Sequence, residues 1–264
     1  MIERKRISFL NSDLSNKPPD MLEICCYSID SALMAQKGGA QRIELCDNVY
    51  EGGTTPSYGT IKKVRAELDI DVNIIVRPRG SDFVYSENEF EIMKEDIEMA
   101  KKLGVDGIVI GLLNTDGTVD VPRTKVLVEL ARPMSVTFHR AFDLTLDFKK
   151  SLEDVIATGC DRILSSGQEN KAVEGLDTLA KMVKQANGRI IIMPGSGLDE
   201  NNVKTIKEAT NANEFHGSLR TPTESKMKFR KQGINMGGVP NISEYEIFVS
   251  DPERIRKVVE IINQ

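Results

Sequence analysis

The feature that most constrains the fold is a junction that recurs where a helix should pass into a strand. Residues 39–43, 104–108 and 159–163 each begin with glycine, continue through a short turn and end in an apolar stretch. Glycine commonly ends helices because it adopts the left-handed conformation without steric cost. The repetition therefore predicts helices that alternate with strands along the chain.

The alternation can be followed through eight strand–helix units. The predicted strands cover residues 22–26, 42–46, 72–77, 107–112, 135–139, 162–166, 190–193 and 214–216. Helix start signals lie at Ser57, at Ser86 with Glu89, at Asp120 with Pro122, and at Asp251 with Pro252. Eight such units in 264 residues predict one (β/α)8 TIM barrel. A doubly wound open sheet is the alternative.

A dinucleotide cofactor is not expected from this pattern. The first strand–helix turn, residues 25–28, lacks the glycine-rich fingerprint that cradles a pyrophosphate. The same observation argues against the doubly wound sheet.

The barrel domain is expected to span residues 21–264, with a final helix in residues 251–264. Residues 1–20 are polar and proline-containing, and they predict an N-terminal arm without regular structure. Residues 218–250 lack clear periodicity, which is typical of a lid, an arm or an interface segment.

Composition excludes several classes of partner. A net charge of −5 and a pI near 5.3 argue against a nucleic-acid-binding face. No apolar run approaches the roughly 18 residues that a membrane span needs. The four cysteines show no framework spacing and no C-x-x-C motif, which predicts reduced thiols in a cytoplasmic protein.

Period-two alternation indicates which strand residues face the barrel axis. In four of the predicted strands one face is apolar and must pack on the helices, so the other face points inward. The axial residues predicted in this way are Glu23, Cys25, Glu44, Cys46, Thr137, His139, Glu214 and His216. Glutamates inside a barrel are costly unless they are paired, and Arg77, with Arg79 just beyond it, is the expected partner.

These groups converge on the carboxyl ends of the strands, where TIM barrels carry their active sites. In an enzyme, Glu23 or Glu44 would be the general base, His139 the acid or electrophile, and Arg77 a clamp for an acidic group of the substrate. Alternatively, Glu23, Glu44, His139 and His216 would bind a divalent metal such as Mn or Zn. The alternative that needs no ligand is an ion-pair network that only stabilises the barrel.

Glycine-rich turns follow the last two predicted strands. Gly195, Ser196 and Gly197 follow the seventh, and Ser218 follows the eighth. In TIM barrels these turns commonly offer backbone N–H groups to a phosphate, so we expect a small anionic ligand, with Arg77, Arg79 and Arg140 adding positive charge. Ordinary tight turns are the alternative.

A set of motifs resembles the CutC copper homeostasis family. The motifs occupy residues 23–25, 42–46, 51–57, 77–80, 82–83, 85–86, 137–143, 166–167 and 227–230. The resemblance covers residues from about 21 to 230 and implies a cytoplasmic TIM barrel, often oligomeric, with a link to copper tolerance. It also implies that Cys25 and Cys46 bind Cu(I), for which soft thiolates are suitable ligands.

Three functions remain open at this point. The chain is a Cu(I)-binding protein of copper homeostasis, or a lyase, isomerase or metal-assisted hydrolase that acts on a small anionic or phosphorylated substrate, or a non-catalytic binder of a small anionic metabolite. In each case we expect a homo-oligomer.

Overall fold

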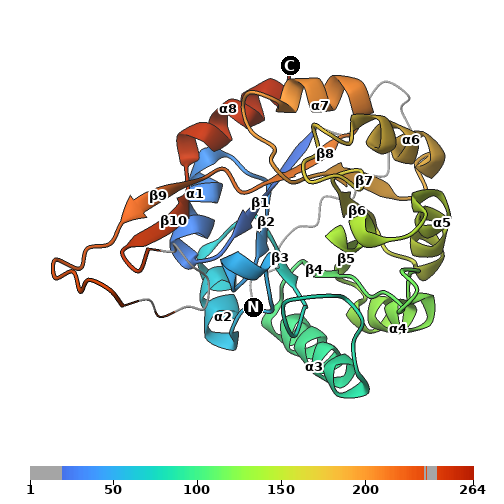
Figure 1. Cartoon of the computed structure of the whole chain (residues 1–264), viewed down its shortest axis with the longest axis horizontal. Coiled ribbons are helices and arrows are strands. Elements are labelled where there is room, and N and C mark those ends of the chain that lie inside the picture. The colour runs from blue at the N-terminus through green and yellow to red at the C-terminus, as the bar shows by residue number, and fades with distance from the viewer. Residues whose placement is uncertain (1–19, 235, 237–242) are drawn as a thin grey trace.

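The computed structural model describes residues 20–234, 236 and 243–264, in which strands and helices alternate as predicted. The barrel strands are β1 (Met21–Cys26), β2 (Arg42–Leu45), β3 (Asp71–Ile75), β4 (Gly107–Ile110), β5 (Ser135–Phe138), β6 (Arg162–Ser165), β7 (Ile191–Pro194) and β8 (Glu214–Gly217). The helices are α1 (Ile29–Gly38), α2 (Tyr58–Glu67), α3 (Glu87–Leu103), α4 (Val121–Ala131), α5 (Phe148–Thr158), α6 (Leu176–Ala186), α7 (Val203–Thr210) and α8 (Pro252–Ile262). Figure 1 shows the helices arranged around the strands.

The strands form a nearly closed parallel barrel. Their order is β7-β6-β5-β4-β3-β2-β1-β8, so the last strand returns to pair with the first. A single parallel bridge between Gly195 and His216 joins β7 to β8. The TIM-barrel prediction is confirmed, and the open-sheet alternative is wrong because β8 pairs with β1. Each predicted strand matches an observed one to within about two residues at its ends, the usual uncertainty of such boundaries.

Local chemistry explains where the helices begin and end. Ser86 and Glu89 form a complete capping box at the start of α3. Gly39, Gly104 and Gly159 follow α1, α3 and α5 with φ of 93°, 73° and 84°, a conformation that side chains with a Cβ rarely adopt. The recurring glycine junction is therefore a set of left-handed helix C-caps.

The buried hydrophobic residues divide as the alternation predicted. Leu22, Ile24 and their counterparts on the other strands pack in one large cluster between the barrel and the helices. Cys25, Cys46, Ile75 and Val109 form a separate small cluster inside the barrel. Odd-numbered residues of β1 and even-numbered residues of β2 thus face the axis.

The segment between β8 and α8 contains two strands that the sequence reading did not predict. β9 (Arg220–Glu224) pairs antiparallel with β10 (Glu246–Ser250), and Figure 1 shows the pair projecting from the side of the barrel near α1. Pro222 weakens the strand pattern of β9 in the sequence, because proline within a sheet is confined to edge strands. At the base of the pair, the backbone N–H of Ser250 donates to Ser31 Oγ on α1 at 3.0 Å.

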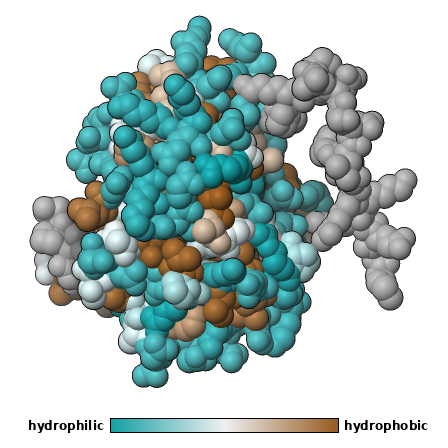
Figure 2. All heavy atoms as spheres, turned by 90° about the vertical axis from the view of Figure 1, so that its right-hand side faces the viewer, coloured by the Kyte–Doolittle hydropathy of each residue, from teal (hydrophilic) through white to brown (hydrophobic). Residues whose placement is uncertain are grey.

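The predicted arm at residues 1–20 lies almost entirely outside the described residues, which begin at residue 20. Among the helices that are described, none combines the length and the apolar character needed to cross a lipid bilayer. Figure 2 views the molecule from the side of α5 and shows a mainly hydrophilic outer surface with smaller hydrophobic areas.

Candidate functional site at the mouth of the barrel

Four charged side chains lie inside the barrel near the amino-terminal ends of the strands, with the mouth above them at the carboxyl ends. They form what we call the ion-pair layer: Glu23, Arg42, Arg162 and Glu214. Arg42 Nε donates to Glu23 Oε2 at 2.5 Å, and Arg42 Nη2 donates to Glu214 Oε2 at 2.5 Å. Arg162 Nε donates to the same Glu214 oxygen at 3.0 Å. Burial alone would raise the pKa of Glu23, but the adjacent Arg42 guanidinium holds it well below its usual range.

Arg42 is therefore the partner of Glu23 and Glu214, whereas Glu44 lies beside His216, and the expectation that Arg77 pairs with the buried glutamates is wrong. Glu23 and Arg42 are direct neighbours in the register of β1 and β2. Arg77 lies two residues beyond the end of β3, nearer the mouth, and donates to the backbone carbonyls of Glu51 and Gly53 at 2.6 and 2.7 Å. Arg42 has the same parity as the axial residues of β2, so the period-two rule contained the signal for it.

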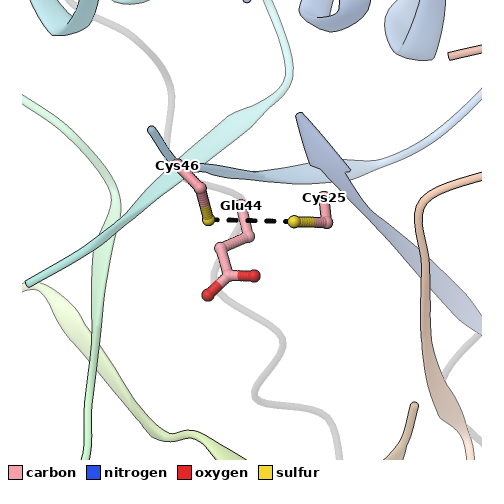
Figure 3. A group of neighbouring side chains, drawn as sticks. All are labelled: Cys25, Glu44 and Cys46. Carbon is pink, nitrogen blue, oxygen red and sulfur yellow. Dashed lines mark hydrogen bonds between the residues drawn. The ribbon is translucent and has the colours of Figure 1, made fainter. Parts of the chain in front are cut away.

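Two thiols and a carboxylate lie above this layer and form what we call the thiol cluster: Cys25, Glu44 and Cys46. The Cys25 and Cys46 Sγ atoms are 3.7 Å apart, and Figure 3 shows the Glu44 carboxylate beside the gap between them. One ligand atom from each residue lies within 4.8 Å of the other two. All three side chains are buried.

The pKa values of the three groups in the thiol cluster are shifted in different directions. The hydrogen bond from Cys46 and the proximity of His216 lower the pKa of Cys25 well below the usual thiol range. Burial raises the pKa of Cys46 and of Glu44, and the neighbouring Cys25 thiolate adds to both shifts. Cys25 is therefore the member of the cluster whose ionised form its surroundings favour.

His216 connects the thiol cluster to the ion-pair layer. Its Nδ1 lies 2.8 Å from Glu23 Oε1, and its Nε2 lies 3.6 Å from Glu44 Oε2. Burial opposes a charge on the ring, but Cys25 and the two glutamates raise the pKa of His216 well above its usual value. These neighbours therefore favour the protonated form of the imidazole.

A cavity of about 520 Å³ opens above these groups at the carboxyl ends of the strands. Cys25, Glu44 and His216 contribute to its lining, and Arg77 and His139 line it from other strands. This volume lies in the range of small-molecule sites. The predicted convergence of polar axial groups on the barrel mouth is thus observed.

His139 presents an unpaired donor to this cavity. The backbone N–H of Ala141 donates to Nδ1 at 3.0 Å, so Nε2 carries the ring proton. Burial and the nearby Arg77 charge lower the pKa of His139 to about 3, which keeps the ring neutral. Within the described part of the chain, Nε2 has no hydrogen-bond partner. A neutral imidazole with a free N–H suits donation to a bound oxygen better than it suits proton abstraction.

The predicted anion-binding residues are divided between the cavity and its surroundings. Ser196, Gly197 and Ser218 line the cavity, whereas Gly195 forms the bridge that closes the barrel. Arg79 is not among the lining residues, and its guanidinium is engaged by Glu89 at 2.5 Å and by Asp82 at 3.0 Å.

Arg140, which was expected to add positive charge at the mouth, is among the residues that line the cavity. It follows β5 and forms an ion pair with Asp143 at 2.8 Å. Its remaining guanidinium nitrogens donate to Ser196 Oγ at 3.2 Å and to Ser166 Oγ at 2.9 Å. It thereby ties together the loops after β5, β6 and β7. Its position directly after His139 in the sequence indicated that it lies at the mouth.

Comparisons with known proteins agree with the architecture. The chain matches the CutC family over residues 20–221. It is 49% identical over 242 residues to a family protein CutC of Chromobacterium violaceum, covering 91% of this chain and 98% of the relative. It is 42% identical over 254 residues to the copper homeostasis protein cutC homolog of Homo sapiens, covering 96% of this chain and 93% of the relative.

Solved structures give the same result. A CutC crystal structure from Streptococcus agalactiae superposes with a TM-score of 0.72 at 36% identity, covering 75% of this chain and 98% of that one. Phosphoribosyl anthranilate isomerase of Thermotoga maritima, with a TM-score of 0.57, 11% identity and coverage of 92% and 98%, shares the fold alone. The chain therefore belongs to the CutC family.

Proposed function

We propose that this CutC-family protein acts in copper homeostasis by binding Cu(I) through Cys25 and Cys46. The observation that carries the proposal is the separation of 3.7 Å between the two Sγ atoms, of which that of Cys25 belongs to a residue that lines the cavity. Thiolates are the protein ligands that Cu(I) prefers, and the lowered pKa of Cys25 favours its thiolate form. The copper homeostasis role named for the human relative supports the same reading.

The backbone geometry favours a metal over a disulfide at this pair. Cys25 is the register partner of Glu44, so Cys46 lies two residues further along β2. A strand spacing of about 4.8 Å and a two-residue rise of about 6.6 Å place the two Cα atoms about 8 Å apart. Disulfides rarely span more than about 7 Å between Cα atoms. The thiols can therefore share an ion more readily than they can bond to each other.

The test is a Cu(I) titration of the whole chain under reducing conditions against a competing chromophoric chelator. The protein should bind one Cu(I), and Cys25→Ser with Cys46→Ser should abolish that binding. Cys160→Ser is the matched control, because Cys160 is also a buried free thiol but its pKa is raised to about 12 and it lies outside the cavity. Unchanged Cu(I) affinity in the double variant would refute the proposal.

A second candidate function is the binding or conversion of a small anionic metabolite in the same cavity. The free Nε2–H of His139 favours it, because a buried unpaired donor is costly unless a ligand accepts its hydrogen bond. Native mass spectrometry of the purified protein would show whether a metabolite remains bound. Loss of that species in His139→Gln, with the fold retained, would support this candidate, and its retention would count against it.

The setting that fits copper handling is the cytoplasm, and we propose a homo-oligomer there. The four cysteines are free and buried, as expected in a reducing compartment. Exposed apolar side chains on and near the β9–β10 pair, including Met227, Phe229 and Ile247, offer surface for self-association. Light scattering of the protein in solution measures the number of subunits.

A further inference from the structure

We propose that Cys25 and Cys46 are half of a four-donor site that also binds Zn(II), with Glu44 and His216 as the other two ligands. In this arrangement Glu23 is a positioning residue that orients His216. The inference rests on the proposed function in one respect, since both use the same two thiols. It extends the site to a borderline divalent ion, for which mixed sulfur, nitrogen and oxygen donors are typical.

The first line of argument is the orientation of His216. Its Nδ1 is 2.8 Å from Glu23 Oε1. The other Glu23 oxygen accepts from Arg42 at 2.5 Å and from Asn73 at 3.2 Å, so this carboxylate is held in place from two sides. Because Glu23 occupies Nδ1, the ring offers Nε2 to the space beside Glu44. A carboxylate behind a histidine is the usual outer support of a zinc ligand.

The second line of argument is the spacing of the donor atoms. A tetrahedral zinc ion with Zn–S bonds of about 2.3 Å holds two sulfurs about 3.8 Å apart, and bonds of about 2.05 Å hold nitrogen and oxygen ligands about 3.3 Å apart. The observed distances are 3.7 Å between the two Sγ atoms and 3.6 Å between His216 Nε2 and Glu44 Oε2.

The third line of argument is that Glu44 belongs to both groups of candidate ligands. Its carboxylate lies within 4.8 Å of Cys25 and Cys46, and it also lies within 4.8 Å of Glu23 and His216. Glu44 is therefore the residue that the two groups share. Cys25, Glu44 and His216 also line the same cavity, through which an ion can enter.

The two metals should depend on different parts of the site. Cu(I) is satisfied by two thiolates, whereas Zn(II) needs four donors. In the test, the full chain is titrated with Zn(II) in competition with a chelating indicator. In a second titration Co(II) replaces Zn(II), because the visible spectrum of Co(II) identifies a tetrahedral site with thiolate ligands. The wild-type chain should bind one Zn(II), and His216→Gln should weaken Zn(II) binding at least about tenfold and weaken Cu(I) binding much less.

His139→Gln is the matched control, because it removes the only other histidine in the chain from another wall of the cavity. It should leave Zn(II) affinity unchanged. A measurement on the wild-type chain avoids dependence on how a variant folds. In the ¹H–¹⁵N spectrum of the two imidazoles, Zn(II) should shift the Nε2 resonance of His216 strongly and that of His139 little.

The outcomes separate the two proposals. Equal Zn(II) affinity in His216→Gln and wild type, or an unshifted His216 Nε2, would overturn the four-donor site while Cu(I) binding still upheld the proposed function. Zn(II) binding without Cu(I) binding would overturn the proposed function and uphold the four-donor site. Binding of neither metal would overturn both.

Discussion

The ion-pair layer and the thiol cluster lie in the same barrel, yet their polar groups are satisfied in opposite ways. In the ion-pair layer, Arg42 and Arg162 are both paired with carboxylates at 2.5–3.0 Å. In the thiol cluster and the cavity above it, the two Sγ atoms lie 3.7 Å apart without a positively charged arginine between them, and His139 Nε2 has no partner within the described residues. Buried polar side chains that all have partners help to hold a fold together. A buried polar side chain without a partner indicates a place where a ligand binds.

The largest expected effect concerns the ion-pair layer and tests whether it stabilises the fold. Arg42→Met would leave Glu23 and Glu214 buried without their shared partner, which should cost about 3–5 kcal/mol of unfolding free energy. Urea denaturation measures it. Lys63→Met is the control, because its i,i+4 pair with Glu67 is exposed and should contribute less than about 1 kcal/mol. Similar small losses in both variants would contradict a structural role for the layer.

The second prediction concerns how tightly the cavity wall is packed. A Cβ added at Gly111 would overlap the His139 ring and come within 2.8 Å of the Ala141 Cβ, so Gly111→Ala should cost about 1–3 kcal/mol. Gly59→Ala is the control: its new Cβ meets nothing closer than 3.9 Å and lies within α2, where alanine is preferred to glycine. Thermal denaturation compares the two. If Gly111→Ala were as stable as Gly59→Ala, His139 would not be held as described.

The third prediction uses the pH dependence of stability to test whether His139, in the cavity wall, is held neutral. The folded protein keeps His139 neutral to about pH 3, whereas the unfolded chain gains a proton near pH 6.5. Stability should therefore be complete above pH 6.5 and fall as the pH decreases toward 3. At pH 5 the loss should be about 2 kcal/mol. Urea denaturation at several pH values should show this part of the decline in the wild type and its absence in His139→Gln. An identical decline in both would mean that His139 is not held neutral.

Much of the fold followed from the sequence because its signals are local. The glycine C-caps, the Ser86–Glu89 capping box and the period-two alternation each depend on residues within one turn or one strand. They were sufficient for eight strand–helix units and for the inward direction of Cys25, Glu44, Cys46 and His216. The β9–β10 pair was missed because each strand is defined by the other rather than by its own pattern.

Other features depended on which strands become neighbours. The register of β1 with β2 and β8 placed Arg42 and His216 beside Glu23, while Arg77 lies above them and is bound by backbone carbonyls. The 3.7 Å thiol separation and the open Nε2 of His139 likewise arise from contacts between residues far apart in the chain. The sequence by itself determined which residues face the barrel axis. Only the tertiary structure decided which of them pair and which remain available to a ligand, because pairing depends on distances that closure of the barrel creates.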